Sequence, residues 1–351
     1  MHEPFDFRTF PPFSPELFFS GIDAAMEGIS RFAALSAGCE IGLFDSLEEG
    51  TGEPGKLADS TGTDERSLRN LLGVLADAGL VSCQDGFYQN RPVSSTYLVS
   101  GSPYAQIHYI RKTAIFGKEI WAHLTDCLRD GPVSFEKGFF FREISLPAMA
   151  ENALCGRLQR TIREIINLPG FPACRRMVDL GGGHGLYAIA LAAASPVLET
   201  VVFDLPEVIP LAGKNISLFQ AVRVRTMAGD FFSDSFGSGY DIVLSSSAPS
   251  GKSIDLVERI ADSLNPGGYF VNAQSDDRER RRPWQALEWQ LWTIDNEEKG
   301  RGSYTREKEF LTQEYKTALA EAGLALVREI RIPDDYHADT TVRMMIARKE
   351  G

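Results

Sequence analysis

An apolar segment that contains one acidic residue, Asp179, runs directly into three consecutive glycines, Gly181, Gly182 and Gly183. Glycine allows a tight turn and lets a ligand approach the main chain closely. A helix that begins directly after such a loop offers unpaired N–H groups to an anionic group of a ligand. The residues around Asp179 are therefore a candidate ligand-binding loop between a strand and a helix.

The spacing of the glycines indicates which ligand fits the loop. A nicotinamide-binding loop requires Gly-x-Gly-x-x-Gly, and here the third glycine position holds Leu186. The loop instead reads Gly-x-Gly-x-Gly after an aspartate, which is typical of a pocket for the amino-acid end of S-adenosylmethionine. A plain structural turn is the alternative for a glycine loop taken alone.

A second acidic site follows the next apolar segment. Asp204, with Leu205 after it, closes that segment 21 residues beyond Gly183. An acidic residue at this place can accept hydrogen bonds from both ribose hydroxyls of a nucleoside. We therefore expect Asp204 and Leu205 to lie beside a ribose.

Two further segments complete the pattern of a nucleoside site. Asp230 and Phe231 follow the third apolar segment, where a carboxylate can bind the adenine amino group and a phenyl ring can pack on the base. Ser245 and Ser246 end the fourth apolar segment, so we expect their backbone beside the same ligand. A loop cap would explain Asp230 alone, but it does not explain three ordered sites after three consecutive strands.

The elements that position these residues alternate between strand and helix from about residue 175, which predicts a doubly wound parallel sheet. The expected strands cover residues 176–180, 200–204, 222–228, 240–246, 269–273, 324–332 and 341–348. The expected helices between them cover residues 185–194, 206–216 and 252–264. A five-stranded parallel core that ends in a hairpin suits a methyltransferase sheet, in which the last strand inserts antiparallel.

The first part of the chain has a different pattern. Apolar residues recur at helical spacing over residues 24–47 and 63–78, and two short strands around Asp85-Gly86 follow. Helix, helix and hairpin are the outline of a winged helix. The second helix carries only Arg66 and Arg69 against three acidic residues, whereas a major-groove reader has a basic excess. We therefore expect core or a subunit interface here, with a cofactor-binding regulator that uses the winged helix on DNA as the alternative.

Together, segments 178–185, 204–208, 229–232, 240–246 and 266–268 resemble the small-molecule O-methyltransferase family, typified by plant caffeic-acid enzymes and bacterial polyketide-tailoring enzymes. The resemblance implies an α/β fold, with a doubly wound, seven-stranded Rossmann-like sheet whose last strand is antiparallel, behind a helical, winged-helix N-terminal domain. It implies a dimerisation domain over residues 1–100, a helical linker that caps the acceptor pocket over 101–170, and a methyltransferase domain over 171–351.

The same resemblance implies the ligands and the roles of the site residues. S-adenosylmethionine would be the methyl donor and S-adenosylhomocysteine the product, and the acceptor would be a small aromatic molecule bound by a homodimer. Gly181 and Gly183 would face the methionine end and Asp204 the ribose, while Asp230 and Phe231 would hold the adenine. Acceptor contacts are expected from side chains of the linker and of a helix over 284–296, namely Phe116, Met149, Trp289, Trp292 and Asn296.

The chain departs from the family at the catalytic base. Most members carry a histidine after the fourth strand and an acidic partner at the end of the fifth, and these positions match Ser250 and Gln274 here. Much of the rate acceleration of methyl transfer can come from holding donor and acceptor together. A phenol still has to lose its proton, and a positioned base contributes roughly 10²–10⁴-fold. The replacement candidates are His108 and Tyr304, with Ser250 itself as a third.

The missing dyad leaves the methylated atom open. Transfer to a hydroxyl oxygen is the leading hypothesis, and transfer to sulfur, nitrogen or carbon, including a thiol or a protein side chain, is the alternative. The 36 Lys and Arg against 48 Asp and Glu give a net charge of -12, which argues against nucleic acid or an anionic membrane as partner. The five scattered cysteines favour reduced thiols in a cytoplasmic protein and no metal site.

Overall fold

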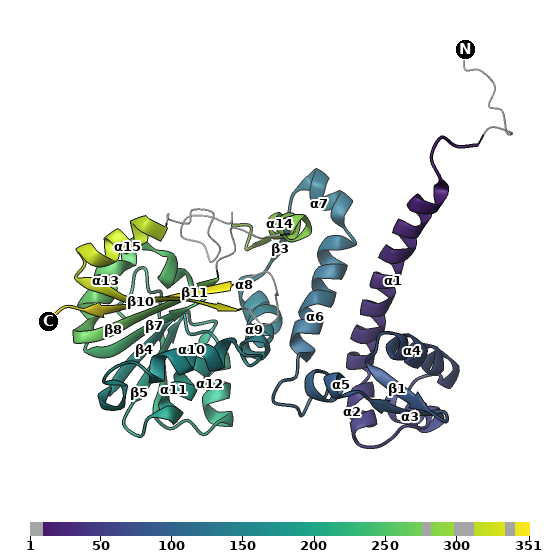
Figure 1. The fold of residues 1–351 in the computed structure, drawn as a ribbon, viewed down its shortest axis with the longest axis horizontal. Helices are drawn as coiled ribbons and strands as arrows, with labels where there is room; N and C mark the ends of the chain where they lie inside the picture. The colour runs from purple at the N-terminus through teal and green to yellow at the C-terminus, as the bar shows by residue number, and fades with distance from the viewer. Residues whose placement is uncertain (1–9, 276–281, 298–311, 334–340) are drawn as a thin grey trace, which may run out of the picture. The chain divides into compact units, whose positions relative to one another are not determined.

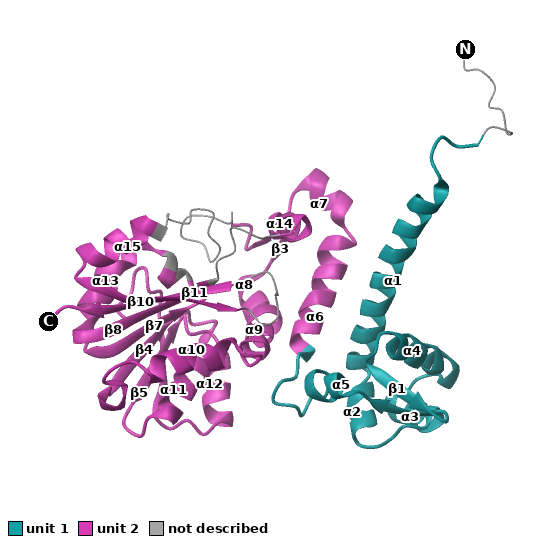
Figure 2. Ribbon diagram, viewed as in Figure 1, with its two compact units in different colours: residues 1–107 teal, residues 108–351 magenta. Residues whose placement is uncertain are grey.

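The computed structural model describes residues 10–275, 282–297, 312–333 and 341–351. They form two compact units, Met1–Ile107 and His108–Gly351 (Figure 2). Among the described residues, no helix combines the length and apolar character that a bilayer span requires. The five cysteines, all among the described residues, form no disulfide with one another.

The first unit has the expected helix, helix and hairpin outline (Figure 1). Its elements in chain order are α1 (Pro15–Glu40), α2 (Leu43–Glu48), α3 (Pro54–Thr61), α4 (Glu65–Asp77), β1 (Val81–Gln84), β2 (Phe87–Asn90) and α5 (Pro92–Tyr97). The β1–β2 turn places Asp85 and Gly86 at positive φ, as a two-residue hairpin requires. Leu68, Leu72 and Leu75 form the buried stripe of α4.

The expected start of the first helix, at residue 24, was wrong. Helix α1 begins nine residues earlier at Pro15, because the Ser14 hydroxyl caps it by accepting a hydrogen bond from the Glu16 N–H at 3.3 Å. Proline at the first helical position adds to this signal, since its missing N–H has no partner there in any case. The added turns expose the large apolar side chains of Phe18 and Ile22, and the exposed row continues along α1 to Ile29.

The second unit is built on a seven-stranded sheet of order β10-β11-β8-β7-β4-β5-β6. Its strands are β4 (Arg176–Leu180), β5 (Glu199–Asp204), β6 (Val224–Ala228), β7 (Tyr240–Ser246), β8 (Leu264–Ser275), β10 (Leu324–Pro333) and β11 (Thr341–Lys349). The last strand, β11, is antiparallel to both neighbours, β10 and β8, and the pairs from β8 to β6 are parallel. The expected sheet, with its antiparallel last strand, is confirmed.

Helices cover both faces of this sheet. Successive strand residues point to opposite faces, so Met177 belongs to one buried cluster and Val178 to the other. The first cluster packs against α10 (Arg157–Ile166), α11 (Leu186–Ala194) and α12 (Ile209–Leu218), and the second packs against α13 (Val257–Ser263) and α15 (Thr312–Glu321). The helix expected over 252–264 is shorter than predicted, because two 3-10 turns, η4 (Pro249–Lys252) and η5 (Ile254–Leu256), precede α13.

A third buried cluster, rich in aromatic side chains, lies among the remaining elements. These are α6 (Ile107–Phe116), η1 (Gly117–Trp121), α7 (Leu124–Asp130), β3 (Val133–Phe135), α8 (Lys137–Phe139), η2 (Phe140–Ser145), α9 (Leu146–Ala153), α14 (Pro283–Gln290) and β9 (Trp292–Ile294). We call it the aromatic cluster. The rings of Phe116, Phe135, Phe140 and Trp292 contact one another in this cluster at centroid distances of 5.0–6.4 Å.

The expected helix over 284–296 was wrong in its second half. Helix α14 ends at Gln290, and Trp292 lies on β9, which pairs in parallel with β3. Pairing with a distant strand overrides the local helical spacing of the tryptophans. Asn296 follows at positive φ and is exposed, so it does not share a helical face with Trp289 and Trp292.

Candidate active site

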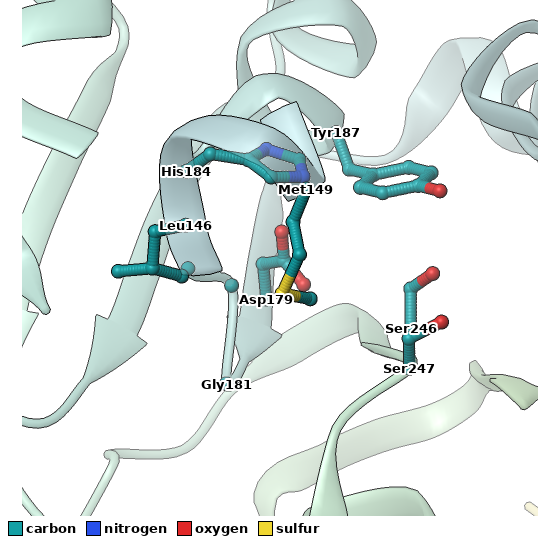
Figure 3. A pocket seen from close by; sticks show the side chains of 10 residues that line it. Leu146, Met149, Asp179, Gly181, His184, Tyr187, Ser246 and Ser247 are labelled. Carbon is teal, nitrogen blue, oxygen red and sulfur yellow. The ribbon is translucent and has the colours of Figure 1, made fainter. Parts of the chain in front are cut away.

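A small hollow opens where the chain reverses its order in the sheet. From β4 the chain builds outward through β5 and β6, and it then crosses to β7 on the other side of β4. Ligands of open α/β sheets bind at the carboxyl ends of the strands beside such a switch point. Ten residues line the hollow, from α9, the end of β4, the glycine loop, the start of α11 and the end of β7 (Figure 3): Leu146, Met149, Asp179, Gly181, Gly182, Gly183, His184, Tyr187, Ser246 and Ser247.

The glycine loop has the conformation and the close contacts that require glycine. Gly181 and Gly183 have φ of 73° and 51°, in the left-handed region. A Cβ on Gly181 would lie 2.6 Å from the Cβ of Ala248, so a side chain does not fit there. The loop is tied to the next strand, because the Gly181 N–H donates to the Phe203 carbonyl at 2.8 Å.

Asp179 brings a buried carboxyl to the hollow. Its side chain is 1% exposed, and no hydrogen bond from any described residue reaches Oδ2. Burial, and secondarily the charge of Asp204, raise the pKa of Asp179 to about 8. A buried acceptor without a partner costs free energy unless a ligand supplies the donor. Asp179 is therefore suited to receive a cationic group.

Asp204 ends β5 next to the glycine loop. Oδ2 accepts a hydrogen bond from the Gly183 N–H and Oδ1 accepts one from the Leu205 N–H, both at 2.8 Å. Burial raises the pKa of Asp204 to about 6, although these two hydrogen bonds oppose the shift. Asp204 does not line the hollow itself, and each of its oxygens keeps a lone pair beyond the backbone contact.

The predicted adenine residues lie at the end of β6. Phe231 is buried beside the loop, since a Cβ on Gly181 would be 3.5 Å from its ring. Asp230 is half-buried and accepts a hydrogen bond from the Phe232 N–H at 2.8 Å. The Arg259 guanidinium holds this segment by donating to the carbonyls of Phe231 and Phe232. The structure thus brings the three predicted strand-end sites to one edge of the sheet.

Sequence reasoning missed the charged neighbour of the hollow, Arg157. This buried side chain on α10 donates from Nη1 to the Ser247 hydroxyl at 3.2 Å. Ser247 has a φ of 54°, a strained conformation for serine that is common at functional sites. Arg157 lies in an ordinary amphipathic pattern with Arg160 and Arg163, so only its tertiary burial distinguishes it.

His184, which follows the three glycines, lies in the wall of the hollow. It is buried and stacks on Tyr187 at a centroid distance of 5.9 Å. Burial, and then the charge of Arg157, lower its pKa to about 4, so the ring is neutral at physiological pH. Nδ1 accepts the Leu186 N–H at 3.1 Å, which leaves the proton on Nε2.

The two positions of the family dyad hold an uncharged network. The Ser250 hydroxyl is fully buried, 2.7 Å from the Ser245 Oγ, and donates to the Leu180 carbonyl at 2.9 Å. Gln274 Nε2 donates to Asn272 Oδ1 at 2.8 Å. Ser250 and Gln274 therefore have a structural role beneath the loop that follows β7. Neither side chain can take up a proton at neutral pH.

His108 pairs with Glu151 of α9, and this pair lies on the side of α9 that faces away from the hollow. The His108 Nδ1 lies 2.7 Å from Glu151 Oε1. At about 100° per residue, Glu151 projects about 140° from Leu146 and about 200° from Met149, the two α9 residues at the hollow. The pair thus faces away from the glycine loop. The other candidate base, Tyr304, lies outside the described residues.

The predicted acceptor residues fall into two groups. Phe116 and Trp292 are buried in the aromatic cluster, and Met149 and Trp289 pack against it. Asn296 is exposed, and its N–H donates to the Ser134 hydroxyl at 2.8 Å. Leu146 belongs to the cluster, Met149 packs against it, and both line the hollow, so the cluster adjoins the end of the candidate cofactor site.

Comparisons with known proteins agree with this geometry. Residues 121–325 match the O-methyltransferase domain family, and residues 24–100 match the O-methyltransferase dimerisation domain. The chain is 29% identical over 314 residues to 3-hydroxy-5-methyl-1-naphthoate 3-O-methyltransferase of Streptomyces sahachiroi, covering 87% of this chain and 89% of that protein. It is 28% identical over 329 residues to an uncharacterised protein of Methanocaldococcus jannaschii, covering 91% and 88%. The crystal structure of human N-acetylserotonin methyltransferase with SAM is similar in fold, with a TM-score of 0.70 at 23% identity over 98% of this chain and 100% of that one.

Proposed function

The chain belongs to the O-methyltransferase family, and we propose that it transfers the methyl group of S-adenosylmethionine to a hydroxyl oxygen of a small aromatic acceptor. The observation that carries this proposal is the hollow at the β4–β7 switch point. Its lining includes the glycine loop and a buried carboxyl without a partner in the described structure. The strand-end residues Asp204 and Asp230 lie at the same edge of the sheet, outside that lining.

The residues present fit the amino-acid end of the donor. Asp179 Oδ2 is a buried acceptor that matches an ammonium group, and the N–H groups of the glycine loop match a carboxylate. The buried Arg157 guanidinium beside Ser247 adds a positive charge on the same side. Asp204 would hold the ribose hydroxyls, while Asp230 and Phe231 would hold the adenine.

The protein's part in the reaction is to bind and orient. When bound, S-adenosylmethionine supplies an electrophilic methyl group on a sulfonium. The glycine loop and Asp179 fix the donor, and the wall formed by Leu146 and Met149 separates it from water and adjoins the aromatic cluster. Holding the two reactants in line accounts for a large part of the rate of such a displacement.

The proposed acceptor class follows from the missing base. Because Ser250 and Gln274 form a neutral buried network, the acceptor oxygen has to be acidic enough to lose its proton without the family dyad. The similarity to an acetylserotonin O-methyltransferase and to a hydroxynaphthoate 3-O-methyltransferase supports an aromatic hydroxyl as the acceptor. A thiol or an amine can also accept a methyl group without the family dyad. Methylation at sulfur or nitrogen is therefore the competing result that a product analysis would detect.

We further propose that the enzyme is a homodimer held by its first unit. The match to a dimerisation domain covers residues 24–100, and α1 exposes large apolar side chains on one face. Exposed apolar rows of this size on a soluble chain mark interaction surfaces. DNA is a poor alternative partner, because Arg69 of α4 forms an ion pair with Glu65 on the same helix.

The decisive experiment measures donor binding and methyl transfer separately. Calorimetry with S-adenosylhomocysteine should show one site per chain. Incubation with methyl-labelled S-adenosylmethionine and a panel of hydroxynaphthalenes, thiophenols and anilines should then label a hydroxyaromatic. Absence of S-adenosylhomocysteine binding at millimolar concentration would overturn the proposed function.

A further inference from the structure

Lys112 is a half-buried cation at the edge of the aromatic cluster. It lies on α6, one turn before Phe116, and its Nζ is 5.6 Å from the centroid of the Phe116 ring. Phe116 in turn packs on Phe135 and Trp292 in the middle of the cluster. The ammonium group of Lys112 therefore borders an aromatic wall that adjoins the proposed donor site.

The charge of Lys112 has little compensation. Within the described ranges, no hydrogen bond or ion pair of 4 Å or less reaches its Nζ. Glu288 of α14 is the acidic group that acts on it, but one oxygen of that carboxylate accepts the Trp121 indole N–H at 2.6 Å. Burial lowers the pKa of Lys112, and Glu288 opposes that shift. A desolvated cation without a partner costs free energy, which a bound anion would offset.

A lysine on the surface of the same region behaves differently. Lys118, in η1, has an 81% exposed side chain and lies 3.2 Å from Glu119. Lys112 instead directs its charge toward rings, where a flat apolar ligand would pack. An ammonium group that stands at the edge of such a surface can select a ligand by one negatively charged substituent.

From this placement we propose that Lys112 binds a carboxylate carried by the aromatic acceptor, so that the preferred substrates are hydroxyaromatic acids. The inference rests on the proposed function, because it takes the aromatic cluster as the acceptor's binding surface. The ring of the acceptor would pack against the wall that contains Phe116 and Trp292, its hydroxyl would face Met149 and the donor, and its carboxylate would meet the Lys112 ammonium.

A pair of fluorescent probes tests this assignment. Binding of 3-hydroxy-2-naphthoate and of 2-naphthol, which lacks the carboxylate, is measured on the enzyme saturated with S-adenosylhomocysteine. The wild-type protein should prefer the naphthoate by about 10- to 100-fold, the range expected for a hydrogen bond to a charged group. Lys112→Met should abolish this preference and keep the affinity for 2-naphthol, and Lys112→Arg should retain part of it. Lys118→Met is the matched control and should bind both probes as the wild type does.

Thermal melting of the ligand-free variants separates binding from a structural role. If the role of Lys112 is to bind an anionic ligand, Lys112→Met removes an uncompensated charge from the ligand-free protein. The variant should then melt at the same temperature as the wild type or higher. A wild-type enzyme without preference for the naphthoate, or a preference that survives in Lys112→Met, would overturn the inference. Neither result touches the proposed function, which fails only if S-adenosylhomocysteine itself does not bind.

Discussion

The backbone N–H of Gly183 donates a 2.8 Å hydrogen bond to the carboxylate Oδ2 of Asp204. This contact joins the glycine loop after β4 to the end of β5, so one side chain fixes the loop and also stands at the predicted ribose position. We therefore expect changes at Asp204 to affect both the stability of the loop and the binding of the donor.

Replacing Asp204 by alanine should weaken both properties. The variant leaves the N–H groups of Gly183 and Leu205 without their acceptor and removes the proposed ribose contacts. We expect about a 10- to 100-fold loss of S-adenosylhomocysteine affinity by calorimetry and a loss of about 1–3 kcal/mol in the free energy of unfolding. Asp230→Ala removes the proposed adenine contact and the acceptor of one backbone N–H, that of Phe232, so it should lose affinity with a smaller change in stability. Unchanged affinity in Asp204→Ala would contradict the ribose assignment.

Asp179→Asn should stabilise the ligand-free protein at neutral and alkaline pH. Folding raises the pKa of this carboxyl from 3.8 to about 8, so the folded state binds the proton more tightly than the unfolded chain does. The contribution of this group to stability is therefore largest below about pH 4 and declines as the pH rises toward 8. Asparagine imitates the protonated form, and urea unfolding at pH 8 should show a gain of about 1–3 kcal/mol. The gain should shrink toward pH 4.

The same substitution should change how donor binding depends on pH. An ammonium group binds the ionised form of Asp179, so the affinity of the wild type for S-adenosylhomocysteine should rise between pH 6 and 8 as the carboxyl loses its proton. Asp179→Asn should bind more weakly, with an affinity that is flat over this range. An equally steep pH profile in the variant would show that another group controls binding.

The sheet was predictable because its signals are local. β5 and β7 are largely apolar runs that end at a predicted site residue, and the bounds expected for β4 and β7 are those observed. The three strand-end sites followed from the same pattern, since the carboxyl ends of neighbouring parallel strands meet at one edge.

The features that sequence reasoning missed depend on tertiary contacts. Trp292 lies on a strand because a distant segment, β3, pairs with it, and no local pattern shows that partner. Arg157 looks like its neighbours Arg160 and Arg163 on α10, and only the packing of that helix buries it beside Ser247. The uncharged network around Ser250 likewise forms from three separate strands and one turn.

Ser250 should prove structural rather than catalytic. Ser250→Ala removes a hydroxyl that contacts Ser245 and Leu180, which should cost about 1–2 kcal/mol of stability and leave the rate of methyl transfer unchanged. Ser250→His places a larger ring in a fully buried site, so it should lower the melting temperature without raising the rate. A large rate increase in Ser250→His would mean that the site can still accept the family base.

Charge on α1 should dissociate the proposed dimer. Ile22 and Ile29 lie seven residues apart on the same face of α1 and are exposed. Ile22→Glu combined with Ile29→Glu should shift the mass measured by light scattering from two chains to one. Asp23→Asn, on the same helix, is the control and should leave the mass unchanged. A monomeric wild-type protein would contradict the dimer proposal directly.

His108→Gln should leave methyl transfer nearly unchanged, because the His108–Glu151 pair lies on the face of α9 that turns away from the hollow. Glutamine keeps a polar contact to Glu151, so the variant isolates the loss of a proton-accepting ring. We expect the rate with a hydroxynaphthalene acceptor to stay within about 3-fold of the wild type between pH 6 and 9, whereas loss of a general base would cost roughly 10²–10⁴-fold. A drop of that size, recovered at high pH where the acceptor ionises without help, would identify His108 as the base and would show that α9 moves when the acceptor binds.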